Sequence, residues 1–388
     1  MSGRISAGRV YNGAGKVRET FAVGLLRQML EIPSPSYREM DLAEYLAEVM
    51  GGLGFWSYVD GVGNVIGVLE RGSGPVIMLV GHLDTIQGHI PVRSTAGRLY
   101  GRGAADAKGP LAAMICAAAS ATEFTGTIIV AGVVEEETPC SRGAMAIRNT
   151  FAKPDALIVG EPSGCFTVVL GYKGKLDLRY SVDRPPTHPS NPEPKASELA
   201  VSCWNVLTDV LGETDHVAFD KPGVTLDSIS ADTSHAVATM SVRMPLGFDA
   251  AGFVEAVRSR LTVGELVVVN SVTACRASRR NPAVRALTAG IRKQLGQPTV
   301  MVKTATSDMN TLAEVWDVPM ATYGPGDSKL DHADDEHIVL AEYIRGVAVL
   351  SHALDELSYL DQSPVPDNTV ADNTVADNTV GSLEGSQQ

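Results

Sequence analysis

The fold is decided by residues 76–84, which read VIMLVGHLD. Five apolar residues run into Gly81 and predict a short buried strand, with His82 and Asp84 at its carboxyl end. Side chains two residues apart in extended backbone point to the same side of the strand. Histidine is a frequent metal ligand, and the Asp84 carboxylate could orient the imidazole through its second nitrogen. Taken alone, the pair is a weak indication of a metal site.

Helical and strand patterns alternate on both sides of this strand. Apolar residues at helical spacing predict helices over residues 20–31 and 41–53, and a short apolar run predicts a strand over 64–69. The alternation continues with a small-residue helix at 109–121, a strand at 127–134, a helix at 143–149 and a strand at 156–159. This βα order predicts an α/β fold with a mostly parallel sheet and helices on both faces.

The rhythm changes from about residue 175. Strands with period-two alternation are predicted at 175–182, 235–243 and 266–274, with helices at 196–211 and 250–261 between them. The α/β alternation then resumes, with helices at 282–295 and 338–360 and strands at 299–303 and 319–323. We therefore expect a main domain in two parts, residues 1–174 and 281–361, interrupted by a smaller α+β domain at 175–280.

The two ends of the chain carry no predicted chemistry. Residues 367–380 repeat a five-residue unit, DNTVADNTVADNTV, and the polar composition of residues 362–388 predicts a disordered tail. Residues 1–18 lack the apolar core of a signal peptide, and the longest apolar runs are too short to cross a bilayer. We therefore expect a cytoplasmic protein that does not bind membranes.

The composition narrows the classes of function. The formal net charge is −13, from 45 acidic and 32 basic residues, and this balance argues against nucleic-acid binding, which needs a basic surface. The five cysteines have neither zinc-finger nor CxxC spacing, so we expect reduced thiols.

Two further segments place carboxylates beside predicted buried elements. Asp106 lies among small residues in GRGAADAKG (101–109), where it could also cap the following helix. VVEEETPCSRG (133–143) places three consecutive glutamates, residues 135–137, directly after a strand. A charged run is usually a solvated loop. At a buried strand end, however, burial and mutual repulsion would raise the pKa values of these carboxyls, and a bound cation would remove that cost.

The set is completed by Glu161, which follows a strand in IVGEPSG (158–164), and by His332 in YGPGDSKLDHADDEH (323–337). The carboxyl ends of parallel strands are the expected place for a site in an open α/β sheet. Together the segments supply two histidines, one aspartate and two glutamates, with a spare glutamate for proton transfer. Hard oxygen ligands combined with imidazole suit Zn²⁺, Co²⁺ or Mn²⁺.

In this order, the motifs resemble the co-catalytic zinc aminoacylase and carboxypeptidase family, which includes acetylornithine deacetylase, succinyl-diaminopimelate desuccinylase and glutamate carboxypeptidase. The resemblance spans residues 20–358 and rests on GHLD, GRGAADAKG, EEE, GEPSG and a histidine four residues before Glu336. It implies a hydrolase that cuts an amide bond with two divalent metal ions, zinc first, with cobalt or manganese as alternatives. The implied bridging ligand is Asp106; His82 and Glu161 complete one ion, and Glu137 and His332 complete the other.

The resemblance also implies the groups that act beside the ligands. Asp84 orients His82, and Glu136 is the general base. This assignment depends on Gly143, which lies six residues beyond Glu137 as the family's glycine does. A shift of one residue would make Glu135 the base.

The same resemblance makes the inserted domain a lid and dimerisation domain and so predicts a homodimer. His188 in THPSNPEP (187–194) matches a lid histidine that stabilises the oxyanion, often from the partner subunit. In the commoner form of the family an asparagine follows nine residues later, whereas this chain has Ser197. Arg243 matches a lid arginine that binds a substrate carboxylate, although it could also be an exposed strand residue.

A finer resemblance points to the branch that releases lysine or ornithine from the C-terminal glutamate of a small acidic amino-carrier protein, in lysine or arginine biosynthesis. It rests on GHIPVR (88–93), LGYKGKL (170–176), the lid segment 188–198, TATSDMN (304–310) and YGPGDSKLDH (323–332). It places Ser307, Asp308 and Asn310 near the substrate pocket. There Asp308 could meet a cationic substrate side chain, or it could cap the following helix.

An acidic carrier would need local basic residues on this acidic chain, and the candidates are Arg93, Lys173 and Lys175. Three alternatives to this function stay open. The first is an N-acyl amino acid deacylase or dipeptidase that acts on small free substrates, and the second is a carrier-linked step in specialised amino acid biosynthesis. The third is a non-catalytic binding protein with the same fold, and the intact ligand set with Glu136 argues against it.

Overall fold

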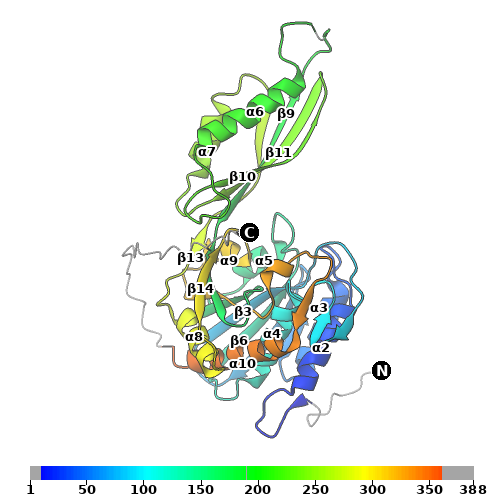
Figure 1. The fold of residues 1–388 in the computed structure, drawn as a ribbon. Helices are drawn as coiled ribbons and strands as arrows, with labels where there is room; N and C mark the ends of the chain where they lie inside the picture. The colour runs from blue at the N-terminus through cyan, green and yellow to red at the C-terminus, as the bar shows by residue number, and fades with distance from the viewer. Residues whose placement is uncertain (1–9, 189, 361–388) are drawn as a thin grey trace, which may run out of the picture.

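A computed structural model describes residues 10–188 and 190–360 of the chain. The expected disordered tail and most of the N-terminal segment lie outside these residues. The described chain forms a large body around a nine-stranded sheet and a smaller unit around a four-stranded sheet, which stands on one side of the body (Figure 1). In that range, no helix combines the length and the apolar character that a membrane span requires.

The nine-stranded sheet has a parallel centre and antiparallel margins. Its order is β1-β2-β6-β3-β7-β15-β8-β13, with β14 paired to β8. Strands β6, β3, β7 and β15 run parallel, whereas β1 and β2 on one side and β8 and β13 on the other make antiparallel pairs. The bounds are β1 (Trp56–Val59), β2 (Val65–Arg71), β3 (Val76–His82), β6 (Gly126–Val133), β7 (Ala156–Gly160), β8 (Thr167–Tyr172), β13 (Cys275–Arg276), β14 (Thr299–Lys303) and β15 (Met320–Thr322).

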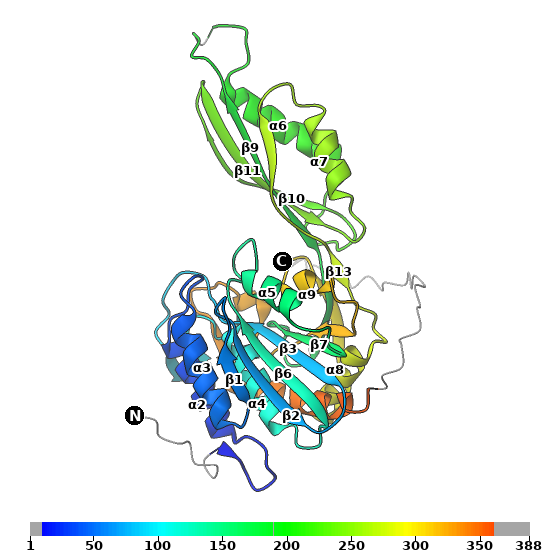
Figure 2. The same cartoon turned by 180° about the vertical axis from the view of Figure 1, so that it is seen from behind.

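Helices cover both faces of this sheet, as the sequence predicts. One face packs against α2 (Glu19–Glu31), α3 (Met40–Gly52), α4 (Lys108–Ser120), α8 (Pro282–Lys293) and α10 (Leu340–Leu357). The other face packs against α5 (Arg142–Thr150) and α9 (Asp308–Ala313). Figure 2 shows β1, β2, β6 and β3 side by side, with α5 and α9 on the near side. The expected α/β class with a smaller α+β unit is confirmed.

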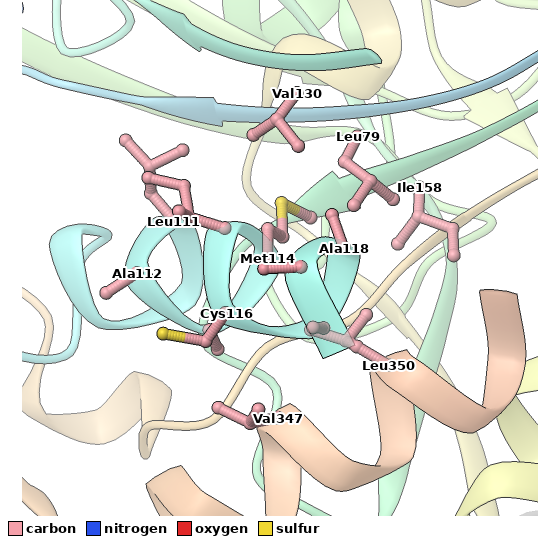
Figure 3. Close-up of a cluster of buried hydrophobic side chains, with 14 of the residues drawn as sticks. Leu79, Leu111, Ala112, Met114, Cys116, Ala118, Val130, Ile158, Val347 and Leu350 are labelled. Carbon is pink, nitrogen blue, oxygen red and sulfur yellow. The ribbon is translucent and has the colours of Figure 1, made fainter. Parts of the chain in front are cut away.

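Helix α4 is rich in small residues and is completely buried. All of its residues are buried, because it lies between the central sheet and α10. In Figure 3, Leu111 and Met114 point toward the sheet, while Cys116 lies on the side of α10 near Val347. Truncating a fully buried leucine such as Leu111 to alanine should cost about 2–5 kcal/mol of stability. The small residues let this helix approach the strands that carry the candidate ligands.

The smaller unit is an antiparallel sheet of order β10-β11-β9-β12, covered on one face by two helices. Its elements are β9 (Gly174–Asp183), α6 (Ala196–Leu211), β10 (Gly223–Ala231), β11 (His235–Met244), α7 (Ala250–Arg258) and β12 (Glu265–Val272). Burial alternates along β9 and β11, as their period-two pattern predicts. Strand β10 was not predicted, because it is an edge strand with mostly exposed polar residues. The domain boundaries at residues 174 and 280 stay a prediction.

A third, three-stranded sheet also escapes prediction. It has the order β16-β5-β4 and joins β4 (Arg93–Thr95) and β5 (Arg98–Tyr100) to β16 (His337–Val339). Each strand has three residues, which is too short for a periodic pattern. The sheet links the segment before Asp106 to the segment after His332, and so it connects two loops of the candidate site.

Candidate metal centre

The five candidate ligands come together at one edge of the central sheet. His82 is the last residue of β3, residues 135–137 follow β6, and Glu161 follows β7. These three strands are parallel neighbours, so their carboxyl ends meet. The other two ligands come from loops: Asp106 lies just before α4, and His332 lies between β15 and α10.

One carboxylate stands between the two imidazoles. Oδ1 of Asp106 is 3.2 Å from Nε2 of His82, and Oδ2 of Asp106 is 3.4 Å from Nε2 of His332. Each imidazole nitrogen also faces a glutamate. The distance from His82 Nε2 to Glu161 Oε1 is 3.9 Å, and that from His332 Nε2 to Glu137 Oε1 is 2.9 Å. The side chains therefore form two clusters that share Asp106.

The donor set suits divalent cations. Ligand atoms of His82, Asp106 and Glu137 all lie within 4.8 Å of one another, and so do those of His82, Glu136 and Glu161. Carboxylate oxygens and imidazole nitrogens together are the ligands of zinc, cobalt and manganese sites. The residues present thus fit a pair of such ions bridged by one carboxylate.

The electrostatics of the cluster favour a cation. Burial, followed by repulsion from Glu161, raises the pKa of Glu136 well above its ordinary value, and burial likewise raises the pKa of Glu161. Burial opposes the ionisation of Asp106, but hydrogen bonds with His332 and His82 hold its pKa well below the usual range. So many carboxyls can ionise together in a buried site only beside positive charge.

Asp84 contacts both His82 and the glutamate loop. The nearest acceptor to His82 Nδ1 is the main-chain oxygen of Asp84 at 2.9 Å, while the Asp84 carboxylate oxygen is 3.6 Å away. That carboxylate accepts hydrogen bonds from the backbone N–H groups of Glu136 and Glu137, at 2.9 and 3.0 Å, and from the Ser36 hydroxyl at 2.8 Å. Asp84 therefore orients the imidazole mainly through its backbone and holds the glutamate loop through its side chain.

The structure separates the three consecutive glutamates. Glu135 accepts hydrogen bonds from Arg142 Nε at 2.8 Å and Nη2 at 2.6 Å, and its backbone N–H donates to Glu39. Glu136 instead lies among His82 and Glu161, and Glu137 faces His332. Gly143 fits this loop because a Cβ there would come within 2.5 Å of the Val134 backbone nitrogen. The geometry favours Glu136 over Glu135 as the general base.

Glu336 is a positioning residue that the sequence did not reveal. Its carboxylate accepts hydrogen bonds from the backbone N–H groups of Gly103, Ala105 and Asp106, at 2.9–3.0 Å. It also pairs with Arg102 Nη1 at 2.9 Å, and it is 1% exposed. These bonds fix the loop that presents Asp106. The only sequence signal was an acidic residue at a fixed spacing after His332.

The predicted pocket residues lie beside the cluster, on the side of the smaller sheet. A cleft there is lined by Glu136 and Ser307 from the body and by Lys175 and Asn270 from the smaller sheet. Arg243, at the near end of β11, donates from Nη1 to the Thr306 hydroxyl at 3.3 Å. Ser307 is the N-cap of α9, and its hydroxyl accepts from the Met309 N–H.

Asp308 and Asn310 are both buried. One carboxylate oxygen of Asp308 has no hydrogen-bond partner among the described residues, and burial raises the pKa of this group to about 7. The Asn310 amide donates to the backbone oxygens of Lys173 at 3.0 Å and Thr273 at 2.8 Å and accepts from the Ser307 N–H. Lys173 and Thr273 are the two points where the chain crosses between body and smaller sheet. Asn310 thus joins the two crossing points of the chain, and both of its amide N–H groups are used for this.

His188 does not join the cluster within this chain. Strand β9 leaves the body at Gly174 and ends at Asp183, at the far end of the smaller sheet, and the loop with His188 follows there (Figure 1). The side chain is exposed, and its Nδ1 lies 2.7 Å from the Ser190 hydroxyl. Its predicted role in oxyanion stabilisation stays a prediction.

One of the three basic residues predicted to attract a carrier is in the wrong place. Lys173 is fully buried, and its Nζ donates to the backbone oxygens of Asp215 and Lys221. Lys175 is paired with Asp177 at 3.1 Å. Arg93 alone is exposed, on β4. Lys173 is a structural part of the hinge because the loop after α6 covers it.

The chain is similar to known proteins over most of its length. Residues 78–356 match Peptidase family M20/M25/M40. The chain is 39% identical over 354 residues to a LysW-lysine hydrolase of Deinococcus radiodurans, across 86% of this chain and 96% of the relative. It is 36% identical over 348 residues to a putative LysW-lysine/LysW-ornithine hydrolase of Pyrococcus furiosus, across 87% and 98%. An M20 family metallo-carboxypeptidase from Sulfolobus solfataricus has a similar fold, with a TM-score of 0.73 and 18% identity over 87% of this chain and 99% of that one.

Proposed function

Because the chain belongs to Peptidase family M20/M25/M40, a family of metal-dependent hydrolases, we propose a specific hydrolysis for it. The proposed substrate is a small acidic amino-carrier protein whose C-terminal glutamate carries lysine or ornithine. The bond to be cut is the amide between the glutamate γ-carboxyl and the amino acid's α-amino group. The observation that supports this chemistry is the position of Asp106, whose carboxylate lies within 3.4 Å of both imidazoles.

We propose two divalent metal ions as cofactors, with zinc first and cobalt or manganese as alternatives. Asp106 would bridge them, His82 and Glu161 would complete one site, and Glu137 and His332 would complete the other. When bound, such ions polarise a scissile carbonyl and lower the pKa of an attacking water. The buried carboxyls support this assignment, since each would be costly to ionise without a cation.

Glu136 would move the proton. It would accept a proton from the attacking water while the water oxygen bonds to the amide carbon. It would then deliver the proton to the α-amino nitrogen as the carbon–nitrogen bond breaks, which leaves a free γ-carboxyl on the carrier. Glu136 lies beside His82 and Glu161, so its carboxylate is close enough to the cluster to hold a proton between these two steps.

The relatives' names support the choice of substrate. Both name hydrolases of LysW-linked amino acids, and the chain covers nearly the whole length of each. Lysine and ornithine carry cationic side chains, and the buried Asp308 offers a carboxylate oxygen without a partner among the described residues. Arg243, which contacts Thr306 in the lining of the same cleft, would bind a substrate carboxylate, and Ser307 would line the pocket.

We further propose that residues 175–280 act as a lid and dimerisation domain for the catalytic domain formed by residues 1–174 and 281–361. His188 lies at the far end of that unit. Another copy of the chain could bring this imidazole to the cluster, where it would stabilise the oxyanion. The proposed active form is therefore a homodimer.

The test is an assay of purified, zinc-loaded protein on carrier-linked lysine, carrier-linked ornithine and acetylornithine. We expect release of lysine or ornithine from the carrier, loss of that release after chelation, and its return when zinc or cobalt is added. Turnover of acetylornithine alone would contradict the carrier-linked substrate and favour a deacylase of small molecules. Equal turnover before and after thorough chelation, checked by metal analysis, would contradict the two-metal mechanism.

A further inference from the structure

Two cations stand side by side at the end of the smaller sheet that meets the cleft. Lys175 on β9 and Arg243 on β11 are register partners. Side chains directly opposite each other in an antiparallel pair have Cβ atoms about 4.5–5.5 Å apart, and like charges in these positions are destabilising. The placement therefore costs stability unless negative charge lies close to both groups.

The face of the sheet that carries these cations is turned to the cleft. Along β9, Leu176 and Leu178 alternate with Lys175 and Asp177, and the two leucines are buried in the core under the helices. Lys175 and Asp177 therefore lie on the face that no helix covers. Lys175 lines the cleft together with Glu136, and its side chain is 27% exposed.

The protein supplies negative charge to only one of the two cations. Lys175 Nζ lies 3.1 Å from a carboxylate oxygen of Asp177, and the Asn270 amide lies 3.4 Å from the same oxygen. Among residues 10–188 and 190–360, Arg243 has no carboxylate within 4.0 Å, and its Nη1 donates to the Thr306 hydroxyl instead. A ligand with two negative groups would balance the pair.

The substrate proposed above has one carboxylate on each side of the scissile amide. That amide joins the γ-carboxyl of the carrier's C-terminal glutamate to the α-amino group of lysine or ornithine. The glutamate therefore keeps a free α-carboxylate, and the amino acid to be released keeps its own. A simple acyl group such as acetyl would leave only the second of these two carboxylates.

We propose, on the basis of the proposed function, that Lys175 binds the α-carboxylate of the carrier's C-terminal glutamate, while Arg243 binds that of the amino acid to be released. The flexible stem of Lys175 allows its ammonium group to turn from Asp177 into the cleft. A hydrogen bond between two ionised groups is about twice as strong as one between neutral groups. Lys175 is then the residue that makes the site selective for γ-linked glutamate over simple acyl groups.

The experiment uses two small substrates that differ in one carboxylate. Both consist of N-acetyl-glutamate joined through its γ-carboxyl to the α-amino group of the amino acid that the carrier assay releases. One substrate keeps the glutamate α-carboxylate, and the other has an α-carboxamide in its place. Values of kcat/KM are measured for the zinc-loaded full-length protein and for its Lys175→Met and Lys175→Arg variants. Lys293→Met, at an exposed position on α8, is the matched control, and metal analysis and thermal melts accompany each variant.

We expect the wild type and the control to prefer the carboxylate substrate by about 10-fold to 100-fold, which is the effect of one hydrogen bond to a charged group. Lys175→Met should reduce this preference to less than about threefold, and Lys175→Arg should retain most of it. A preference that Lys175→Met leaves unchanged would overturn the assignment. An equal loss on both substrates would overturn it too, because Lys175 would then only offset the charge of the metal cluster.

The outcomes also separate this proposal from the proposed function. Equal turnover of both small substrates by the wild type, together with turnover of the carrier-linked amino acid, would refute the role of Lys175 and keep the proposed function. Hydrolysis of acetylornithine without turnover of any glutamate-linked substrate would refute the proposed function and the role of Lys175 with it.

Discussion

In the body the five candidate metal ligands converge within one chain, whereas in the smaller unit the residues with proposed roles lie at opposite ends. His82, Asp106, Glu137, Glu161 and His332 face one another at the carboxyl edge of a single sheet. Arg243 lies at the near end of β11 and touches Thr306, while His188 follows the far end of β9. The body is therefore ready to bind metal as a single chain, but the smaller unit cannot bring both residues to the same place.

The two regions differ in whether their residues can reach the site within one chain. Ligands on parallel neighbouring strands are positioned by the backbone hydrogen bonds of the sheet, which form when the chain folds. A residue at the end of a protruding sheet can reach a site only through hinge motion or a second copy of the chain. The body would then form the metal centre within one chain, and the smaller unit would supply its histidine from outside that centre.

The largest effect is expected from Glu136→Gln, because the proposed proton transfer needs an ionisable group at that position. Turnover should fall by about 10³-fold or more, while metal content stays unchanged. Glu135→Gln is the matched control, since Glu135 is paired with Arg142 instead of facing the cluster. Metal analysis and steady-state kinetics on both variants are the measurements. A severe loss in Glu135→Gln with an active Glu136→Gln would move the base by one residue.

A smaller but still large effect is expected from His188→Ala, which removes an oxyanion donor. We expect kcat to fall by about 10²-fold to 10³-fold with metal content intact. If the histidine acts from a partner, equal mixing with Glu136→Gln protein should restore about a quarter of wild-type activity. Half of the randomly formed dimers are then mixed, and each has one intact site. If mixing the two variants restores no activity, His188 either lies outside the active site or acts within its own chain.

The sequence predicted the centre better than it predicted the groups that hold it. The ligand candidates follow strand ends or glycine-rich turns, and such positions are visible in local patterns of apolar and small residues. The bond between Glu336 and the backbone of Asp106 joins residues 230 apart, and no local pattern reveals such a contact. The Asp84 carboxylate lies 3.6 Å from His82 Nδ1, and it also holds the backbone of the glutamate loop, which the sequence did not reveal. Which polar group a carboxylate meets depends on the tertiary fold.

The burial of Lys173, where the chain crosses from the body to the smaller sheet, could not be predicted from the sequence either. Lys173 lies in a segment, LGYKGKL, whose lysines suggest an exposed surface. The loop after α6 folds back over it and supplies two backbone oxygens to its ammonium group. Strand β10 was missed for the opposite reason, because its exposed polar residues resemble a loop. Local polarity therefore predicted the wrong environment for Lys173 and the wrong secondary structure for β10.

Glu336→Gln tests how the body holds Asp106 in place. The amide has one oxygen where the carboxylate has two, so it cannot accept the three backbone bonds and the Arg102 pair together. Metal affinity should fall by about 10-fold to 100-fold, as for other groups that orient metal ligands. Chelator competition measures this affinity, and Asp334→Asn, in an exposed part of the same loop, is the control. Unchanged affinity would mean that the loop is fixed by other contacts.

The smallest effect on catalysis is expected at the hinge, from Asn310→Ala. This change leaves the backbone oxygens of Lys173 and Thr273 without their donor, at a cost of about 1–3 kcal/mol in the free energy of unfolding. The ligand cluster is untouched, so metal affinity should stay constant while KM rises several-fold through a less defined lid position. Denaturant unfolding and kinetics, with the exposed Asn205→Ala as control, measure both effects. A loss of metal without a change in KM would show that Asn310 supports the metal centre. The position of the lid and the metal centre would then not be independent of each other.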